Sequence, residues 1–139
     1  MKYLKIITPF FMLLTMSCAS QNIDKSFDSI KYEARTRGSM TLINVDAKEV
    51  SYKLPKKEGV YELSKEQLRS LNELVSLIKL TEIADLKAAT NNRATDMALI
   101  GKIVIVLKGK KYVSSSFDAG NPPKELKKLE DLLYSLIKK

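Results

Sequence analysis

The first regular pattern along this sequence is an alternation of apolar and polar residues. Ile30, Tyr32 and Ala34 are separated by polar neighbours, and this period of two is typical of a strand with one buried face. Gly38 supplies a turn, because glycine adopts the positive φ that other residues resist. Three consecutive strands are therefore predicted, over residues 29–35, 41–45 and 50–54. Pro55 closes the third, and residues 56–59 are predicted as a polar loop that contains Gly59.

The period then changes to that of a helix. Apolar residues three and four positions apart form one stripe, which consists of Leu68, Leu71, Leu74, Val75 and Ile78. Ser64 and Gln67 have the spacing of a capping box, and Leu63 and Leu68 that of a hydrophobic staple. The sequence therefore predicts a helix that begins after Ser64.

The second half repeats the change from strand to helix. Residues 81–86 are predicted as a short helical turn and residues 91–96 as a polar loop. Residues 99–107 are almost all apolar, which favours a central strand covered on both faces, or by helix on one face and by a tethered neighbour on the other. Residues 108–110 form a tight turn to a further strand over residues 111–117.

A second helix closes the chain. Asn121 is predicted as its cap and Pro122 as its first residue, where the missing N–H costs nothing. The element order β-β-β-α-β-β-α predicts an α+β fold, in which two helices pack on one face of an antiparallel sheet of about five strands. Residues 27–139 are expected to form this single domain.

Residues 1–17 have the composition of a secretory signal peptide. Two lysines precede an apolar run over residues 6–16, and small residues follow it. The run is shorter than the ~20 residues of a transmembrane helix. The end of the segment, Thr15-Met16-Ser17-Cys18, resembles the lipobox of bacterial lipoproteins, although Thr15 replaces the usual Leu. Ordinary cleavage after Ala19 is the alternative.

The lipobox resemblance implies that Cys18 carries lipid, including palmitate-type acyl chains. The only cysteine of the chain would then anchor it to a bacterial envelope membrane, and residues 18–26 would be a flexible tether. The expected location is the outer membrane, and a secreted or periplasmic protein is the alternative. The formal charge of +8 comes from scattered lysines without interleaved aromatic residues. Nucleic acid is therefore not an expected partner, and attraction to anionic lipid or glycan is a better use of the charge.

The composition excludes several kinds of catalytic site. The chain has no histidine and one cysteine, so His-based triads, Cys–His dyads and His/Cys zinc sites are ruled out. Residues 114–116 are serines without a histidine base, and a nucleophile would need a lysine such as Lys102 or Lys111. No catalytic residue, metal or cofactor is predicted, and the chain is expected not to be an enzyme.

Two segments are candidates for binding. The loop of residues 91–96 offers Asn91, Asn92, Arg93 and Asp96, because loops on a rigid scaffold often carry recognition. If the loop is exposed, substitutions there change stability little. Asp118 precedes the second helix, whose N–H groups favour an anion. The alternatives are a solvated connection for the loop and a strand end followed by a proline-started helix for Asp118.

Three segments, residues 27–32, 63–68 and 117–126, resemble a family of small lipoproteins of unassigned function from Bacteroidetes-type bacteria. The element order is also similar to that of emfourin-type inhibitors of thermolysin-like metalloproteases, whose Gly-rich first turn is reduced here to Arg37-Gly38-Ser39. The resemblance implies binding of a protein or peptide partner, such as a protease, but no inhibitory residue carries over. A structural lipoprotein of an envelope assembly is the alternative.

Overall fold

The computed structural model describes residues 27–95 and 97–138. The predicted signal segment 1–17, Cys18, the tether 18–26 and Asp96 lie outside these residues.

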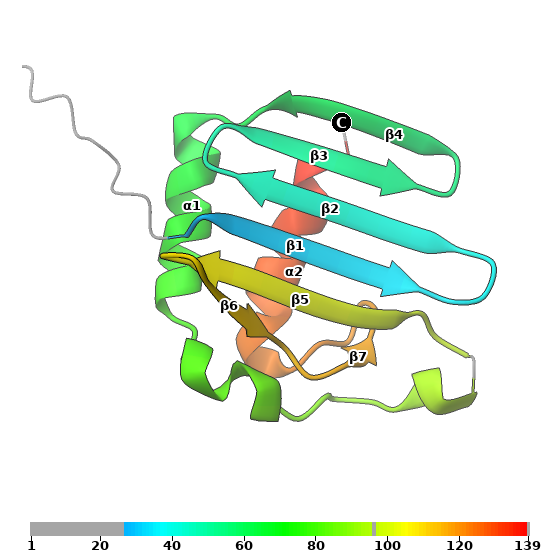
Figure 1. The fold of residues 1–139 in the computed structure, drawn as a ribbon. Coiled ribbons are helices and arrows are strands. Elements are labelled where there is room, and N and C mark those ends of the chain that lie inside the picture. Colours follow the sequence, from blue (N-terminus) through cyan, green and yellow to red (C-terminus); the bar gives the residue numbers. More distant parts are fainter. Residues whose placement is uncertain (1–26, 96, 139) are drawn as a thin grey trace, which may run out of the picture.

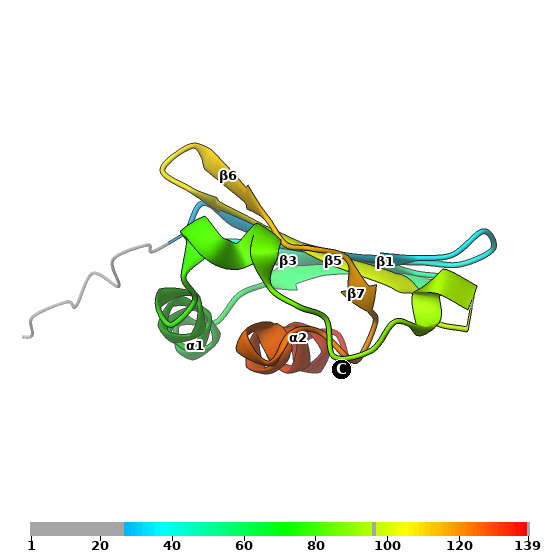
Figure 2. The ribbon, with the colours of Figure 1, turned by 90° about the horizontal axis from the view of Figure 1, so that it is seen from below.

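Within the described residues the chain forms one antiparallel sheet and two α-helices, which confirms the α+β class (Figure 1). The spatial order is β4-β3-β2-β1-β5-β6, and β7 pairs with β5. The strands are β1 (Ser29–Arg35), β2 (Met40–Asp46), β3 (Glu49–Leu54), β4 (Lys57–Glu62), β5 (Ile100–Leu107), β6 (Lys110–Val113) and β7 (Phe117–Asp118). The helices are α1 (Lys65–Ser76) and α2 (Lys124–Leu136), with 3-10 turns η1 (Leu80–Asp85) and η2 (Asn92–Thr95). Both α-helices lie on the same side of the sheet (Figure 2).

The central strand β1 explains where the core lies. Tyr32 pairs with Ile43 of β2 on one side and with Ile103 of β5 on the other. All three side chains are fully buried, because alternate residues of a strand point to the same face and that face meets the helices. The leucines of α2 complete the core from the other side. The inward face of the sheet therefore packs against α1 and α2, and β6 packs against η1.

The opposite face of the sheet is not covered by a helix (Figure 2). On β5, Ile103 and Ile105 are buried, but Val104 and Val106 between them are only half-buried. The prediction that residues 99–107 form a central strand is confirmed. Only one face of β5 is covered, so the expectation that both faces are covered, whether by the fold or by a tethered neighbour, is not met in the described residues, and Val104 and Val106 lie on the uncovered side (Figure 2).

The sheet has seven strands, whereas the sequence predicts about five. The first difference is β4, which occupies residues predicted as a polar loop. Pro55 and Lys56 form a two-residue turn, and β4 returns antiparallel to β3 with Tyr61 opposite Val50. The Tyr61 hydroxyl donates to the Leu136 carbonyl at the end of α2. An edge strand needs few apolar residues, which is why its pattern looked like a loop.

The second difference is that residues 111–117 are not one strand. β6 ends at Val113, and β7 begins at Phe117. Between them, the Ser114 hydroxyl accepts from the Ile103 N–H (3.0 Å) and donates to the Ser115 carbonyl (2.8 Å). The Ser114 N–H still donates to the Ile103 carbonyl (2.9 Å), so its hydroxyl replaces only the second backbone bond of this pair, and the ladder ends here. Phe117 then packs against Gly101, where a Cβ atom would lie 2.6 Å from its ring.

The predicted start of α1 is confirmed and that of α2 is wrong. Gln67 N–H donates to the Ser64 hydroxyl (3.1 Å), and Ser64 N–H donates to the Gln67 side chain (2.9 Å), which completes the capping box. In contrast, α2 begins at Lys124 after Pro123, three residues beyond Asn121. The Asn121 N–H instead donates to the Asp118 carbonyl (2.8 Å). No helix within the described residues has both the length and the apolar character to cross a membrane.

Candidate functional site

The two candidate binding segments meet at the carboxylate of Asp118. This side chain, on β7, is fully buried. Its oxygens accept from the Asn92 N–H (2.7 Å), the Arg93 N–H (2.9 Å) and the Arg93 guanidinium (3.1 Å). The Thr90 hydroxyl is a fourth donor. The structure therefore brings Asp118, Asn92 and Arg93 together, and Asp96 lies outside the described residues.

The charge of Asp118 is fixed by these donors. Burial alone would raise the pKa of its carboxyl, but the hydrogen bonds from Thr90, the backbones of Arg93 and Asn92, and the Arg93 side chain lower that pKa well below its ordinary range. A carboxylate with four donors already in place has no free lone pair aimed at solvent. The cluster has the chemistry of an anchor that holds η2 against β7.

The loop residues differ in how many of their polar groups are free to contact a partner. The Arg93 guanidinium also donates to the Thr90 carbonyl (2.8 Å), and its side chain is 21% exposed. The expectation that Arg93 is fully exposed is therefore wrong, and its contacts indicate that it contributes to stability. Asn91 and Asn92 are exposed, but the Asn92 backbone is already bound to Asp118. Most of the polar capacity of this loop is used internally.

A second buried carboxylate, Glu130 of α2, was missed by the sequence analysis. Its Oε1 atom accepts from the Tyr32 hydroxyl (3.0 Å) and from the Gly120 N–H (2.9 Å). The Tyr134 hydroxyl donates in turn to Tyr32 (3.1 Å). Its Oε2 atom has no hydrogen-bond partner in the described part of the chain, and the Lys127 ammonium lies 3.9 Å away.

The electrostatics of Glu130 are opposite to those of Asp118. Burial raises the pKa of the Glu130 carboxyl, and the bonds from Gly120 and Tyr32 only partly counteract that rise. Burial also raises the pKa of the Tyr32 hydroxyl far above its ordinary range. One signal was available in the sequence, because Glu130 lies on the same helical face as the buried Leu126 and Leu133.

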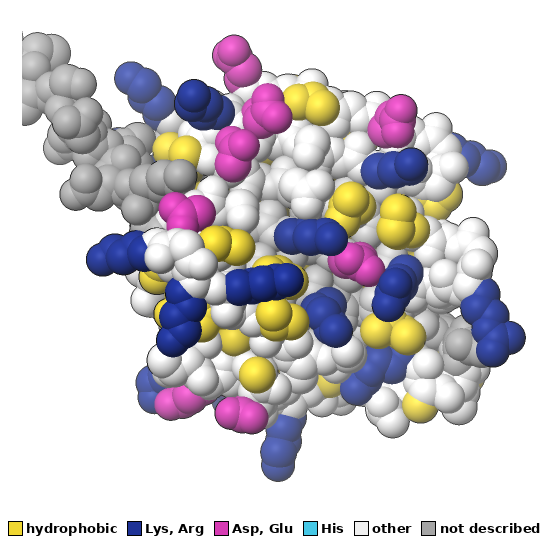
Figure 3. All heavy atoms as spheres, viewed as in Figure 1, with side chains coloured by type: hydrophobic (Ala, Val, Ile, Leu, Met, Phe, Trp, Pro, Cys, Tyr) yellow, Lys and Arg dark blue, Asp and Glu magenta, His cyan; other side chains and the backbone are white. Residues whose placement is uncertain are grey.

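The uncovered face of the sheet carries both charged and apolar side chains. A hollow of about 280 Å³ lies over β1, β5 and β6, and its lining residues are Lys31, Glu33, Lys102, Val104, Lys111 and Val113. A second hollow of about 370 Å³ lies over β2, β3 and β4, where Leu42, Lys53, Glu58 and Val60 contribute to the lining. Basic side chains gather over the middle of the face with hydrophobic ones between them (Figure 3).

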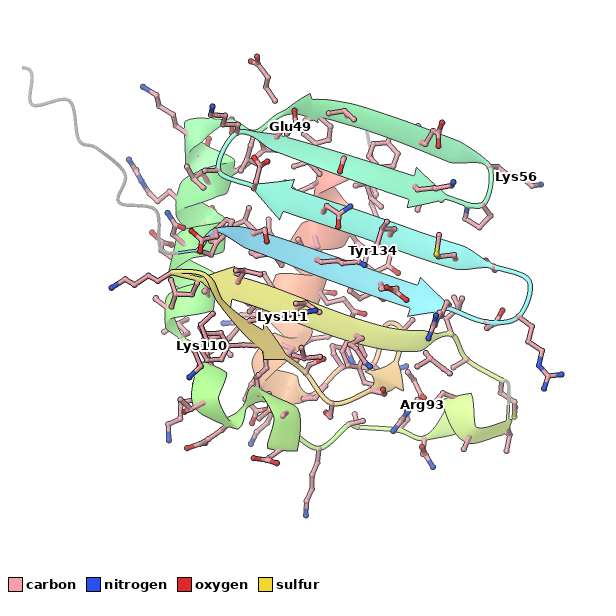
Figure 4. All side chains as sticks on the ribbon, viewed as in Figure 1. Glu49, Lys56, Arg93, Lys110, Lys111 and Tyr134 are labelled. Carbon is pink, nitrogen blue, oxygen red and sulfur yellow. The ribbon has the colours of Figure 1, made fainter. Side chains whose placement is uncertain are left out.

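Only some of the charged side chains on this face form ion pairs with other described residues. Glu33 contacts Lys31 (3.3 Å) on one side and Arg35 (3.5 Å) on the other. Lys102 and Lys111 are exposed and form no ion pair with any residue in 27–95 or 97–138. Figure 4 shows Lys111 on β6, beside β5. The sequence analysis considered both lysines only as nucleophiles and missed their common surface, which strand pairing creates.

The described residues contain no group of three or more Asp, Glu, His or Cys side chains that could hold a metal ion. No protein-family model, curated protein or solved structure matches this chain. The resemblances to small lipoproteins and to emfourin-type inhibitors therefore stay predictions.

Proposed function

We propose that this chain is a lipid-anchored protein of the bacterial cell envelope whose domain binds a partner protein and catalyses no reaction. The observation that supports binding most directly is the uncovered sheet face. Cys18 at the exit of a signal-like segment supports the anchor, and the outer membrane is the proposed location.

The composition of the uncovered face favours a protein partner. Val60 is 63% exposed, and Met40 and Ile100 are each 40% exposed, on three different strands of this face. Half-buried Leu42, Val104 and Val113 add apolar surface between them. A face that only contacts water is usually polar throughout, whereas apolar side chains gathered on one face mark a contact surface.

The buried polar groups support a role without catalysis. Asp118 and Glu130, the two carboxylates with shifted pKa values, are both buried and hydrogen-bonded within the fold. A general acid or base needs a shifted pKa together with access to substrate, and neither side chain has that access. Their arrangement fits a role in stability.

The uncovered face is a better candidate surface than the loop of residues 91–96. Arg93, the only charged side chain described in that loop, is committed to Asp118. On the sheet, rigid strands instead present many side chains at fixed spacing, and Lys102 and Lys111 form no ion pair among the described residues. Inhibition of a protease is the most concrete form of such binding. The alternative function is that of a structural lipoprotein that supports an envelope assembly.

A site-specific cross-linking experiment tests this proposal. A photoreactive residue replaces Asn44, which lies opposite Lys31 on the uncovered face of the full chain, and a second variant carries it at Lys128 on α2 as the control. In native membranes we expect a discrete cross-linked protein from position 44 and none from position 128. Cross-linking from neither position, or equally from both, would contradict binding through this face. Identification of the partner separates a protease from a stoichiometric envelope complex.

The anchor is tested separately by Cys18→Ser. We expect this variant to move from the detergent phase to the aqueous or precursor fraction. Unchanged labelling by a fatty-acid probe would refute the anchor and leave the binding proposal intact.

A further inference from the structure

The two halves of the uncovered face carry opposite charge. Over β1, β5 and β6 the outward side chains include four cations, Lys31, Arg35, Lys102 and Lys111, and one carboxylate, Glu33. Over β3 and β4 the outward charged residues are Lys53 against Glu49, Glu58 and Glu62. The face is therefore positive on the β5–β6 side and negative toward the β4 edge.

This polarity limits the class of partner. Nucleic acid, polyphosphate or an anionic membrane presents one sign of charge everywhere, so it would be repelled by the carboxylates of the β4 side. A protein surface can match both signs and can also cover the apolar side chains between them. Carboxylates of such a partner would pair with Lys102 and Lys111, which form no ion pair among the described residues.

The strand register defines how those carboxylates are spaced. Lys102 lies opposite Glu33, and Lys111 lies opposite Val106, so the two lysines occupy rows four residues apart along β5. At ~3.3 Å per residue these rows are ~13 Å apart. The row midway between them contains Lys31, Val104 and Val113, which pair side by side across three strands. An extended segment with acidic residues at positions i and i+4 and an apolar residue at i+2 would match this order.

The shape of the sheet favours an extended segment at this place. The β5–β6 hairpin bends away from the helices and rises on the uncovered side (Figure 2). The two-residue turn at Lys108 and Gly109, both with positive φ, closes this hairpin. The raised hairpin forms one wall of the hollow of about 280 Å³.

We infer that the partner surface for this face includes an acidic, extended polypeptide segment that lies in the hollow between β1, β5 and β6. Its carboxylates pair with Lys102 and Lys111, and an apolar side chain between them contacts Val104 and Val113. This inference rests on the proposed function, because it names the chemistry of the partner that the uncovered face binds.

A peptide titration of the isotope-labelled full chain, in an uncharged detergent and followed by NMR, tests the inference. The probe is the capped peptide Thr-Glu-Thr-Val-Thr-Glu-Thr. One control peptide has glutamine in place of both glutamates. A second control peptide places the two glutamates next to each other in the sequence. Two exposed ion pairs and one apolar contact supply only weak binding, so the probe should bind with a Kd of about 5 mM. We expect only the first peptide to shift the amide signals of Val104 and Val113.

Charge reversal makes the test specific. Lys102→Glu combined with Lys111→Glu should weaken peptide binding about tenfold or more, because two attractions become repulsions. The matched control is Lys87→Glu with Lys128→Glu, at exposed lysines away from the uncovered face, and it should change binding less than about twofold. All four lysines are exposed, so the melting temperature should stay nearly constant in both variants.

The outcomes separate this inference from the proposed function. Three results would overturn the acidic segment. The glutamine peptide binds as tightly as the glutamate peptide, the glutamate peptide does not bind at several times the expected Kd, or phosphatidylglycerol vesicles or polyphosphate bind more tightly than the peptide. If cross-linking from position 44 still captured one protein, the face would bind a partner of other chemistry. If that cross-link were also absent, the proposed function itself would fail.

Discussion

Asp118 and Glu130 are both buried carboxylates, yet the protein holds one as a strong anion and disfavours the charge of the other. Asp118 receives four donors from one segment, two of them backbone N–H groups and one a guanidinium. Glu130 receives two donors on one oxygen and none on the other among the described residues. The comparison shows that burial does not fix the charge state of a carboxylate, because the number and kind of donors decides it.

Removing the better-satisfied carboxylate should have the largest effect. Asp118→Ala leaves Thr90, the two backbone N–H groups and Arg93 without their acceptor in a buried place. We expect the melting temperature to fall by more than about 10 °C, because loss of one partner strands the others. Thermal unfolding followed by circular dichroism measures the change. A fall of less than about 3 °C would mean that water replaces the carboxylate at this site.

Matched amide substitutions compare the two carboxylates directly. Asp118→Asn turns an NH₂ group toward donors, so we expect a fall of about 5–10 °C in melting temperature. Glu130→Gln keeps the oxygen that Tyr32 and Gly120 bind and removes a disfavoured charge, so we expect a change within about 3 °C. The same thermal scan measures both variants. The reverse order of the two effects would contradict the assigned charge states.

Substitution of the cation beside each carboxylate should show the same order of effects on stability, with a larger cost for Arg93 beside Asp118 than for Lys127 beside Glu130. Arg93 is 21% exposed and bonds both Asp118 and Thr90, so Arg93→Ala should cost about 1–2 kcal/mol of unfolding free energy. Lys127 has a side chain that is 46% exposed, and it pairs with Asp131 (2.6 Å). Lys127→Ala should therefore cost about 0.5 kcal/mol or less. Urea unfolding of both variants measures this contrast, and equal costs would weaken it.

The pH dependence of stability should show two opposite contributions. The folded-state pKa of Asp118 lies below its ordinary value of 3.8, so its stabilisation is present above that value and is lost as the pH falls. The folded-state pKa of Glu130 lies above its ordinary value of 4.5, so its contribution is present at low pH and is lost as the pH rises through the folded value.

Urea unfolding from about pH 3 to pH 7 separates these contributions. Asp118→Asn should reduce the loss of stability in acid, and Glu130→Gln should reduce the decline above pH 4.5. If both variants show the same pH dependence of stability as the wild type, neither carboxylate controls that dependence.

Local signals made some elements predictable. The capping box of Ser64 and Gln67 defines the start of α1 within four residues of sequence, and the structure forms it as expected. The β4 strand was missed because edge strands do not need an apolar pattern. The start of α2 was misplaced because residues 118–121 form a turn closed by the Asn121 N–H and the Asp118 carbonyl, and the helix begins only after Pro123.

The candidate site was predictable only in its parts. The sequence analysis singled out both Asp118 and the loop of residues 91–96, but their contact spans 25 positions along the chain and depends on the pairing of β7 with β5. Glu130 lies between Lys127 and Asp131 in sequence and looks like another surface charge. The hollow lined by Lys31, Lys102 and Lys111 forms only where β1, β5 and β6 pair, and the sequence of one segment does not show that pairing.

The one-sided coverage of the sheet has an evolutionary consequence. Along β1 and β5, residues that pack on the helices alternate with residues that face outward. A substitution at an outward position can therefore alter recognition without disturbing the packing beneath it, since the two sets of side chains lie on opposite sides of the backbone. Homologues of this chain should keep the inward set nearly constant while the outward set diverges. Such a scaffold can acquire new partners at little cost in foldability.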